Sequence, residues 1–99
     1  EVSDRRRLLK EAACALGRKR GQLIAVLAAE AGIAVEKADV EVCTAVDLAN
    51  YYADSLWWPG LGDGVSTRPL GVVVVAPAVD APLASACDGR YATLMSLSR

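Results

Sequence analysis

The sequence predicts an α/β fold, or a fragment of one, in which a helical N-terminal half precedes a buried strand and a final helix. Three observations lead to this expectation. Apolar residues recur at helical spacing through residues 1–55. Residues 56–69 contain the glycines and proline of a connector. The valines at 72–75 do not alternate with polar residues, which is typical of a strand buried on both faces.

The first helix is expected to begin at Asp4, because aspartate often caps a helix N-terminus. Apolar residues then follow at helical spacing, namely Leu9, Ala12, Ala13 and Leu16. This spacing predicts one helix face that packs against the rest of the domain.

A second helix is predicted over residues 22–31, after a bend at residues 17–21, where two glycines weaken the pattern. It is apolar on nearly every face except at Gln22 and Glu30, which predicts deep burial. Gly32 stands where a left-handed residue commonly ends a helix.

A third, amphipathic helix has the clearest pattern in the chain. Its apolar stripe recurs every three or four residues and comprises Ala38, Val42, Ala45, Val46, Ala49, Tyr52 and Ala53. Acidic residues fall mostly off this stripe, so one face of the helix should lie in the core.

After the connector, residues 70–76 are predicted to form one buried strand of a Rossmann-like parallel sheet, and residues 83–97 could form a last helix. A buried strand needs hydrogen-bonding neighbours on both sides, and the chain offers few candidates. The sequence therefore indicates a single partial domain over residues 1–99. Its expected parts are a helical region (1–55), a connector (56–69), and the first strand and helix of a cofactor-binding domain (70–99).

Composition excludes several classes of protein and site. The net charge of −1 gives no general attraction to nucleic acid, and no apolar segment is long enough to span a membrane. The three cysteines are far apart, which indicates free buried thiols in a reducing cytoplasm and not disulfides or a zinc site. Histidine is absent, so catalytic serine–histidine and cysteine–histidine pairs are excluded.

Four local features admit more than one interpretation. The basic residues of the first helices could bind phosphate or simply face solvent. The aromatic residues Tyr51, Tyr52, Trp57 and Trp58 could pack internally or contact another chain. The glycines at 60, 62 and 64 lack the flanking strand and helix of a dinucleotide loop, so a flexible turn is favoured. Asp80 could meet a ligand at a strand end or serve as a turn or cap residue.

Three sequence segments, in the same order along the chain, resemble the aldehyde dehydrogenase superfamily. They comprise Arg7-Leu8-Leu9 with Ala12-Ala13, Leu23 and Glu30-Ala31-Gly32; Glu41-Val42, Ala45-Val46-Asp47 and Tyr51-Tyr52-Ala53; and Pro69-Leu70-Gly71 with the following valines. The sequence of the second segment looks most like that of the glutamate-semialdehyde (pyrroline-5-carboxylate) dehydrogenases of proline-utilisation proteins.

The resemblance implies NAD as cofactor and oxidation of an aldehyde through a cysteine thiohemiacetal. The family's Pro-Trp-Asn-Phe-Pro-Leu stretch falls on residues 78–83, so the oxyanion-hole position falls on Asp80. The positions that would line the cofactor are Ala76, Pro77, Ala78, Val79 and Asp80. An ionised aspartate cannot donate the hydrogen bond that this catalytic role requires.

The family's catalytic cysteine and general-base glutamate lie far downstream of the matching region, and Cys14, Cys43 and Cys87 do not match the nucleophile's motif. The sequence therefore predicts the N-terminal part of a dehydrogenase that is not catalytic by itself. The expected partners are the remainder of a larger polypeptide and a second copy in a homo-oligomer, with neither nucleic acid nor membrane. A degenerate structural domain and a small helical interaction module are the alternatives.

Overall fold

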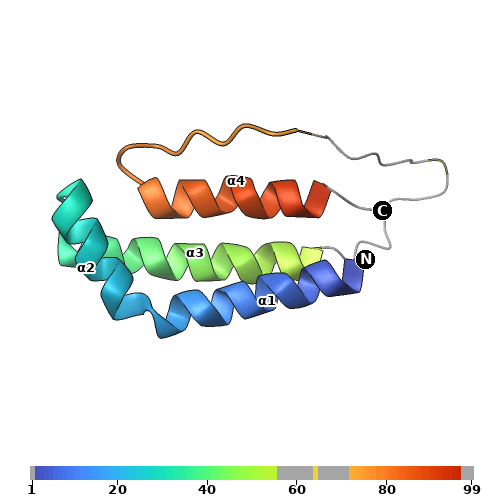
Figure 1. Cartoon of the computed structure of the whole chain (residues 1–99), viewed down its shortest axis with the longest axis horizontal. Coiled ribbons are helices and arrows are strands. Elements are labelled where there is room, and N and C mark those ends of the chain that lie inside the picture. Colours follow the sequence, from blue (N-terminus) through green and yellow to red (C-terminus); the bar gives the residue numbers. More distant parts are fainter. Residues whose placement is uncertain (1, 56–63, 65–71, 97–99) are drawn as a thin grey trace.

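The computed structural model describes residues 2–55, 64 and 72–96 of the chain (Figure 1). These residues form four α-helices, which are α1 (Val2–Arg18), α2 (Arg20–Ala31), α3 (Val35–Ser55) and α4 (Pro82–Ser96). The expected last helix is therefore confirmed as α4. The predicted connector lies outside the described residues, apart from Gly64. None of the described helices combines the length and apolar character needed to cross a membrane.

The predicted α/β architecture is wrong for the described part of the chain. Residues 73–77 have no regular secondary structure, and the only bridge in this segment joins Ala78 to Ala81. Val72 is 97% exposed and Val74 is 88% exposed, so this is not a buried strand of a parallel sheet. A run of β-branched residues needs neighbouring strands for its backbone hydrogen bonds, and the described chain supplies none. Residues 70 and 71 of the prediction lie outside the described part.

Helix α3 is the centre of the fold. It packs against α1, α2 and α4, and Figure 1 shows α1 and α4 running along opposite sides of it. The predicted apolar stripe is confirmed, because its alanines and Val42 are fully buried. Val46 and Tyr52 are partly buried against the same core. Alanine side chains are small, so the neighbouring helices can approach α3 closely.

Helix α1 buries Leu9 and Ala13 against Ala49 and Ala53 of α3, and Tyr91 of α4 joins the same cluster. Leu9 is among the largest fully buried side chains of the described residues. Burying one leucine contributes about 2 kcal/mol relative to exposure. The predicted inward face of the first helix is therefore confirmed.

The bend between the first two helices and the end of the second were both predicted correctly. Lys19 separates α1 from α2. Gly32 ends α2 in the left-handed conformation, with φ of 65°, and its N–H donates to the carbonyl of Leu27. Glycine adopts this conformation without the steric cost that a Cβ would add.

Deep burial of the second helix, however, was predicted wrongly. Leu27 is the one buried residue of α2, and Val26 is 50% exposed. Leu27 packs with Ala38 and Val42 of α3, while the other faces of α2 have no comparable neighbour. The radius of gyration is 15.1 Å, against about 13 Å for a compact domain of ~100 residues. The described residues thus leave apolar surface of α2 uncovered.

Glu41 of α3 is the buried charged residue of the described core, with 6% exposure. Its Oε1 atom has no hydrogen-bond partner. Since burying an unsatisfied polar group costs about 1–3 kcal/mol, we expect Glu41→Met to raise the free energy of unfolding by about 1 kcal/mol or more. Urea denaturation of the 99-residue chain measures this change.

The matched control is Glu30→Met, which replaces an exposed glutamate of α2 and should change stability by less than about 0.5 kcal/mol. A loss of stability in Glu41→Met would show that the carboxylate makes a favourable contact that the described residues do not include.

Candidate functional site

The predicted cofactor-lining residues lie in an extended segment that runs back along α4 (Figure 1). Two contacts attach this segment to the helix. Val75 lies against Gly89, where a Cβ added to the glycine would be 2.6 Å from Val75 Cγ1. The N–H of Ala78 donates to Ser85 Oγ at 2.9 Å. Gly89 is therefore needed for close approach of the segment to α4.

A tight turn leads from this segment into α4. The N–H of Ala81 donates to the carbonyl of Ala78 at 3.3 Å, which leaves Val79 and Asp80 at the corner of the turn. Ser85 Oγ accepts from Ala78 and donates to the carbonyl of Ala81, so one hydroxyl holds both sides of the turn. Pro82 then begins α4, where its missing N–H costs no helical hydrogen bond.

The structure places all five predicted cofactor-lining residues, Ala76, Pro77, Ala78, Val79 and Asp80, on the surface. Asp80 occupies the turn, in agreement with its interpretation as a turn residue.

These residues do not fit a dinucleotide by themselves. The segment is exposed and has no sheet edge beside it in the described chain. Asp80 also puts a carboxylate two residues before α4, where the partial positive charge of a helix N-terminus would otherwise favour a pyrophosphate. No step of a reaction can therefore be derived through NAD from the described residues.

A shallow hollow of about 330 Å³ lies between the extended segment and α4. Its lining is mostly apolar and comprises residues 73–76 together with Ser85, Asp88, Gly89 and Ala92. Asp88 is the charged group in this lining, and its Oδ1 accepts a hydrogen bond of 2.7 Å from Tyr52 Oη on α3. This bond joins α3 to α4 at the edge of the hollow.

Two of the four residues of the predicted aromatic cluster, Tyr51 and Tyr52, lie within the described part of the chain. Tyr51 and Tyr52 meet edge to face with ring centroids 5.4 Å apart, and Tyr52 lies 6.5 Å from Tyr91 of α4. Trp57 and Trp58 lie outside the described residues. Tyr91 was not among the predicted aromatic residues, although it follows Asp88 by three residues and therefore lies on the same side of α4.

Two tyrosines hold their protons more tightly than usual. The hydrogen bond from Tyr52 to the Asp88 carboxylate, with a smaller effect of burial, raises the pKa of Tyr52 to about 12. Burial is the main cause that raises the pKa of Tyr91, and a hydrogen bond with Cys87 adds to it. Neither tyrosine is therefore suited to act as a general base near neutral pH.

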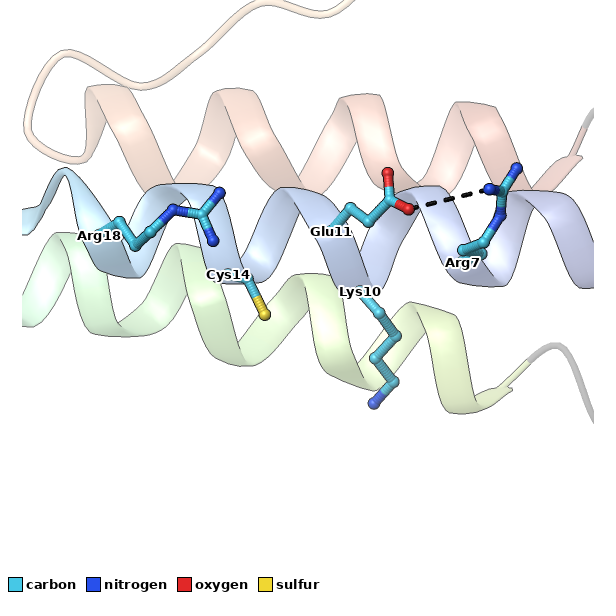
Figure 2. Close-up of a pocket in the computed structure, with 5 residues that line it drawn as sticks. All are labelled: Arg7, Lys10, Glu11, Cys14 and Arg18. Carbon is cyan, nitrogen blue, oxygen red and sulfur yellow. Dashed lines mark ion pairs between the residues drawn. The ribbon is translucent and has the colours of Figure 1, made fainter.

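Three basic residues of α1 line a second hollow, of about 480 Å³, shown in Figure 2, namely Arg7, Lys10 and Arg18. Lys10 points toward α3, where its Nζ lies 3.2 Å from Asn50 Oδ1 and 3.1 Å from Asp54 Oδ1. Arg7 pairs with Glu11 of the same helix at 4.0 Å. Because acidic partners engage Arg7 and Lys10, these two side chains favour a solvated helix face over a phosphate-binding patch.

The cysteines are free, but two of the three are not buried as predicted. Cys14 and Cys43 are exposed, and Cys87 is half-buried. Within the described residues no group of histidine, cysteine or acidic side chains could hold a metal ion. Cys43 Sγ donates to Asp39 Oδ1 at 3.9 Å, and the same carboxylate pairs with Arg20. No metal centre is built from this part of the chain.

The sequence model of the aldehyde dehydrogenase family matches residues 1–95 of the chain. No curated protein and no solved structure matched the chain.

The hydrogen bond between Tyr52 and Asp88 predicts how the stability of the fold changes at alkaline pH. Because the pKa of Tyr52 is raised to about 12, from about 10 in an unfolded chain, its contribution to stability should be complete below about pH 10. That contribution should be lost as pH rises through about 12, when the folded phenol also ionises. Asp88→Asn should lower the pKa of Tyr52 toward about 10, since the charged acceptor is removed.

Ultraviolet titration of phenolate measures this shift, with Tyr52→Phe subtracted to isolate the signal of Tyr52. Tyr51→Phe is the control and should leave the pKa of Tyr52 high. An unchanged titration in Asp88→Asn would mean that the hydrogen bond does not hold in solution.

The contact of Val75 with Gly89 gives a second prediction. Alanine is favoured over glycine inside a helix by about 1 kcal/mol, but in Gly89→Ala the new Cβ would collide with Val75. We therefore expect Gly89→Ala to stabilise the Val75→Ala variant by about 1 kcal/mol. In the chain with Val75 present, the same substitution should stabilise clearly less or destabilise the protein.

Urea denaturation of the four proteins of this double-mutant cycle gives the interaction energy. Equal effects of Gly89→Ala in both backgrounds would place Val75 away from α4 in solution.

Proposed function

The chain belongs to the aldehyde dehydrogenase family, and on that premise we propose that it forms the N-terminal helical part of a larger NAD-dependent dehydrogenase and is not catalytic by itself. The observation that carries the proposal is the extent of the family match, which covers residues 1–95 of 99. The family's members are oxidoreductases. In the proposed enzyme, the nucleophilic cysteine, the general base and the cofactor-binding groups come from the remainder of the polypeptide.

The uncovered apolar surface supports this proposal. Val72, Val74 and Val79 are nearly fully exposed, and the described residues offer nothing that would cover them. Exposed aliphatic surface of this extent favours association with further protein, because removing it from water contributes about 25 cal/mol per Å². In the proposed arrangement, the remainder of the polypeptide packs on the extended segment and on the exposed face of α2 that carries Val26.

We further propose glutamate semialdehyde as the substrate of the parent enzyme. The support is the amino-acid sequence of α3. Its segments Glu41-Val42, Ala45-Val46-Asp47 and Tyr51-Tyr52-Ala53 resemble the corresponding sequence in the dehydrogenases of proline catabolism. These residues form the structural core and the contact with α4, so they indicate kinship and do not select a substrate by contact.

Asp80 favours a second candidate, a degenerate copy that serves as a structural or oligomerisation domain. Its carboxylate is exposed in the turn before α4 and stands where the family resemblance expects a donor to the oxyanion. Loss of one such donor typically lowers turnover by about 10²–10³-fold, and a negative charge at that place would oppose the reaction further.

The test begins with the size of the native polypeptide, by immunoblot against this sequence in its source cells. We expect a band of about 50 kDa or more, the size of several fused domains. The parent is then assayed for NAD-dependent oxidation of glutamate semialdehyde, with a short aliphatic aldehyde as comparison. A native band at 10.4 kDa would rule out the proposed enzyme.

Asp80→Asn in the parent separates the two candidates. A working enzyme should keep or increase its turnover, since the amide restores a hydrogen-bond donor without the charge. A structural copy should show no turnover before or after the substitution. Circular dichroism of both proteins checks that the exposed substitution leaves the helices intact.

A further inference from the structure

An apolar groove of about 350 Å³ lies between α1, the start of α2 and α4. Its apolar lining is formed by Ala12, Ala15, Leu16, Leu23, Cys87 and Tyr91. This surface, here called the α1–α4 groove, is separate from the hollow beside the extended segment, and none of the predicted site residues lines it.

The arrangement of the helices explains why the groove is open. Helices α1 and α4 each pack extensively against α3, but they make little contact with each other. Figure 1 shows the three helices side by side, with α3 between the other two. In a four-helix bundle, a further helix would fill the position between α1 and α4. The described chain leaves that position empty, because α2 turns away at Lys19. Helix α2 packs instead against Ala38 and Val42, in the N-terminal part of α3.

Two cations flank the apolar lining. Lys19 contributes from the break between α1 and α2, and Arg90 contributes from α4. Both are exposed, and neither forms an ion pair with any described residue. By contrast, Arg6, Lys10 and Arg20 engage carboxylates of α3. The groove thus combines an apolar lining with two positive charges that have no ion-pair partner among the described residues, one from the α1–α2 break and one from α4.

We propose that the α1–α4 groove binds an acidic amphipathic helix of a partner protein. The apolar stripe of such a helix covers the half-buried Leu16 and Leu23, and carboxylates beside the stripe meet Lys19 and Arg90. A helix fits better than an extended peptide, because a helix satisfies its own backbone hydrogen bonds while the groove walls are helices without free backbone groups. The positive charges of Lys19 and Arg90 also favour binding of an acidic helix over a basic or neutral one.

The inference does not depend on the proposed enzymatic role, since it uses only the surface of α1, α2 and α4. It adds a protein-binding activity that catalysis would not require.

A designed peptide tests the proposal on the 99-residue chain. The peptide forms about five helical turns, with leucine at the stripe positions and glutamate beside them. Its control carries lysine at each glutamate position. We expect the acidic peptide to bind about tenfold more tightly than the control, as measured by fluorescence anisotropy of the labelled peptides at low salt. Equal binding of the two peptides would overturn the proposal.

Cysteine alkylation locates the bound peptide. Cys87 lines the groove, whereas Cys14 and Cys43 lie on other surfaces and serve as internal controls in the same sample. Saturating acidic peptide should slow alkylation of Cys87 about tenfold, in proportion to occupancy, and leave the other two unchanged. Protection of all three cysteines, or of none, would contradict binding in the groove.

Charge reversal gives the second test. The double variant Lys19→Glu and Arg90→Glu should lose its preference for the acidic peptide and prefer the lysine peptide instead. The matched control reverses Arg18 and Lys37, which are exposed and do not line the groove, so the net charge is the same. If the control variant loses the preference equally, general electrostatics and not the groove would explain binding.

A fatty acid is the competing occupant, because its chain is apolar and its head is anionic. Protection of Cys87 by laurate at submicellar concentration, without protection by the acidic peptide, would replace the helix proposal with a lipid site.

Discussion

The close packing of neighbouring helices on the alanine face of α3 is the constraint on which the described structure depends. Ala38, Ala45, Ala49 and Ala53 have no exposed surface, and every other helix contacts α3. Small side chains at these positions bring α1 and α4 close enough for Leu9 and Tyr91 to complete one cluster. A larger residue on this face would separate the helices, and overpacking of this kind costs about 1–3 kcal/mol.

Organisation around a single helix also explains the uncovered surfaces. Because α1 and α4 depend on α3 and hardly touch each other, a groove remains between them. The same arrangement leaves most of α2 and the valine segment facing solvent. The chain belongs to the aldehyde dehydrogenase family, and its described residues leave these apolar surfaces without a covering neighbour.

Only part of the candidate site could be predicted from the sequence. Asp80 and Tyr52 stand out by residue type and position, but the hydrogen bond from Tyr52 to Asp88 joins residues 36 positions apart, and no local pattern encodes it. The role of Gly89 was also missed. Its signal was a glycine inside a helical segment, which often marks a close backbone approach, and Val75 is the group that approaches.

The sequence by itself determined the helices of the described chain, their bend at Lys19 and their end at Gly32, because apolar periodicity and glycine conformation are local properties. It also determined the buried face of α3. Only the tertiary structure decided whether residues 72–76 were paired and whether α2 was covered. Both outcomes depend on neighbours, and a β-branched or apolar segment stays exposed when the described chain brings no partner against it.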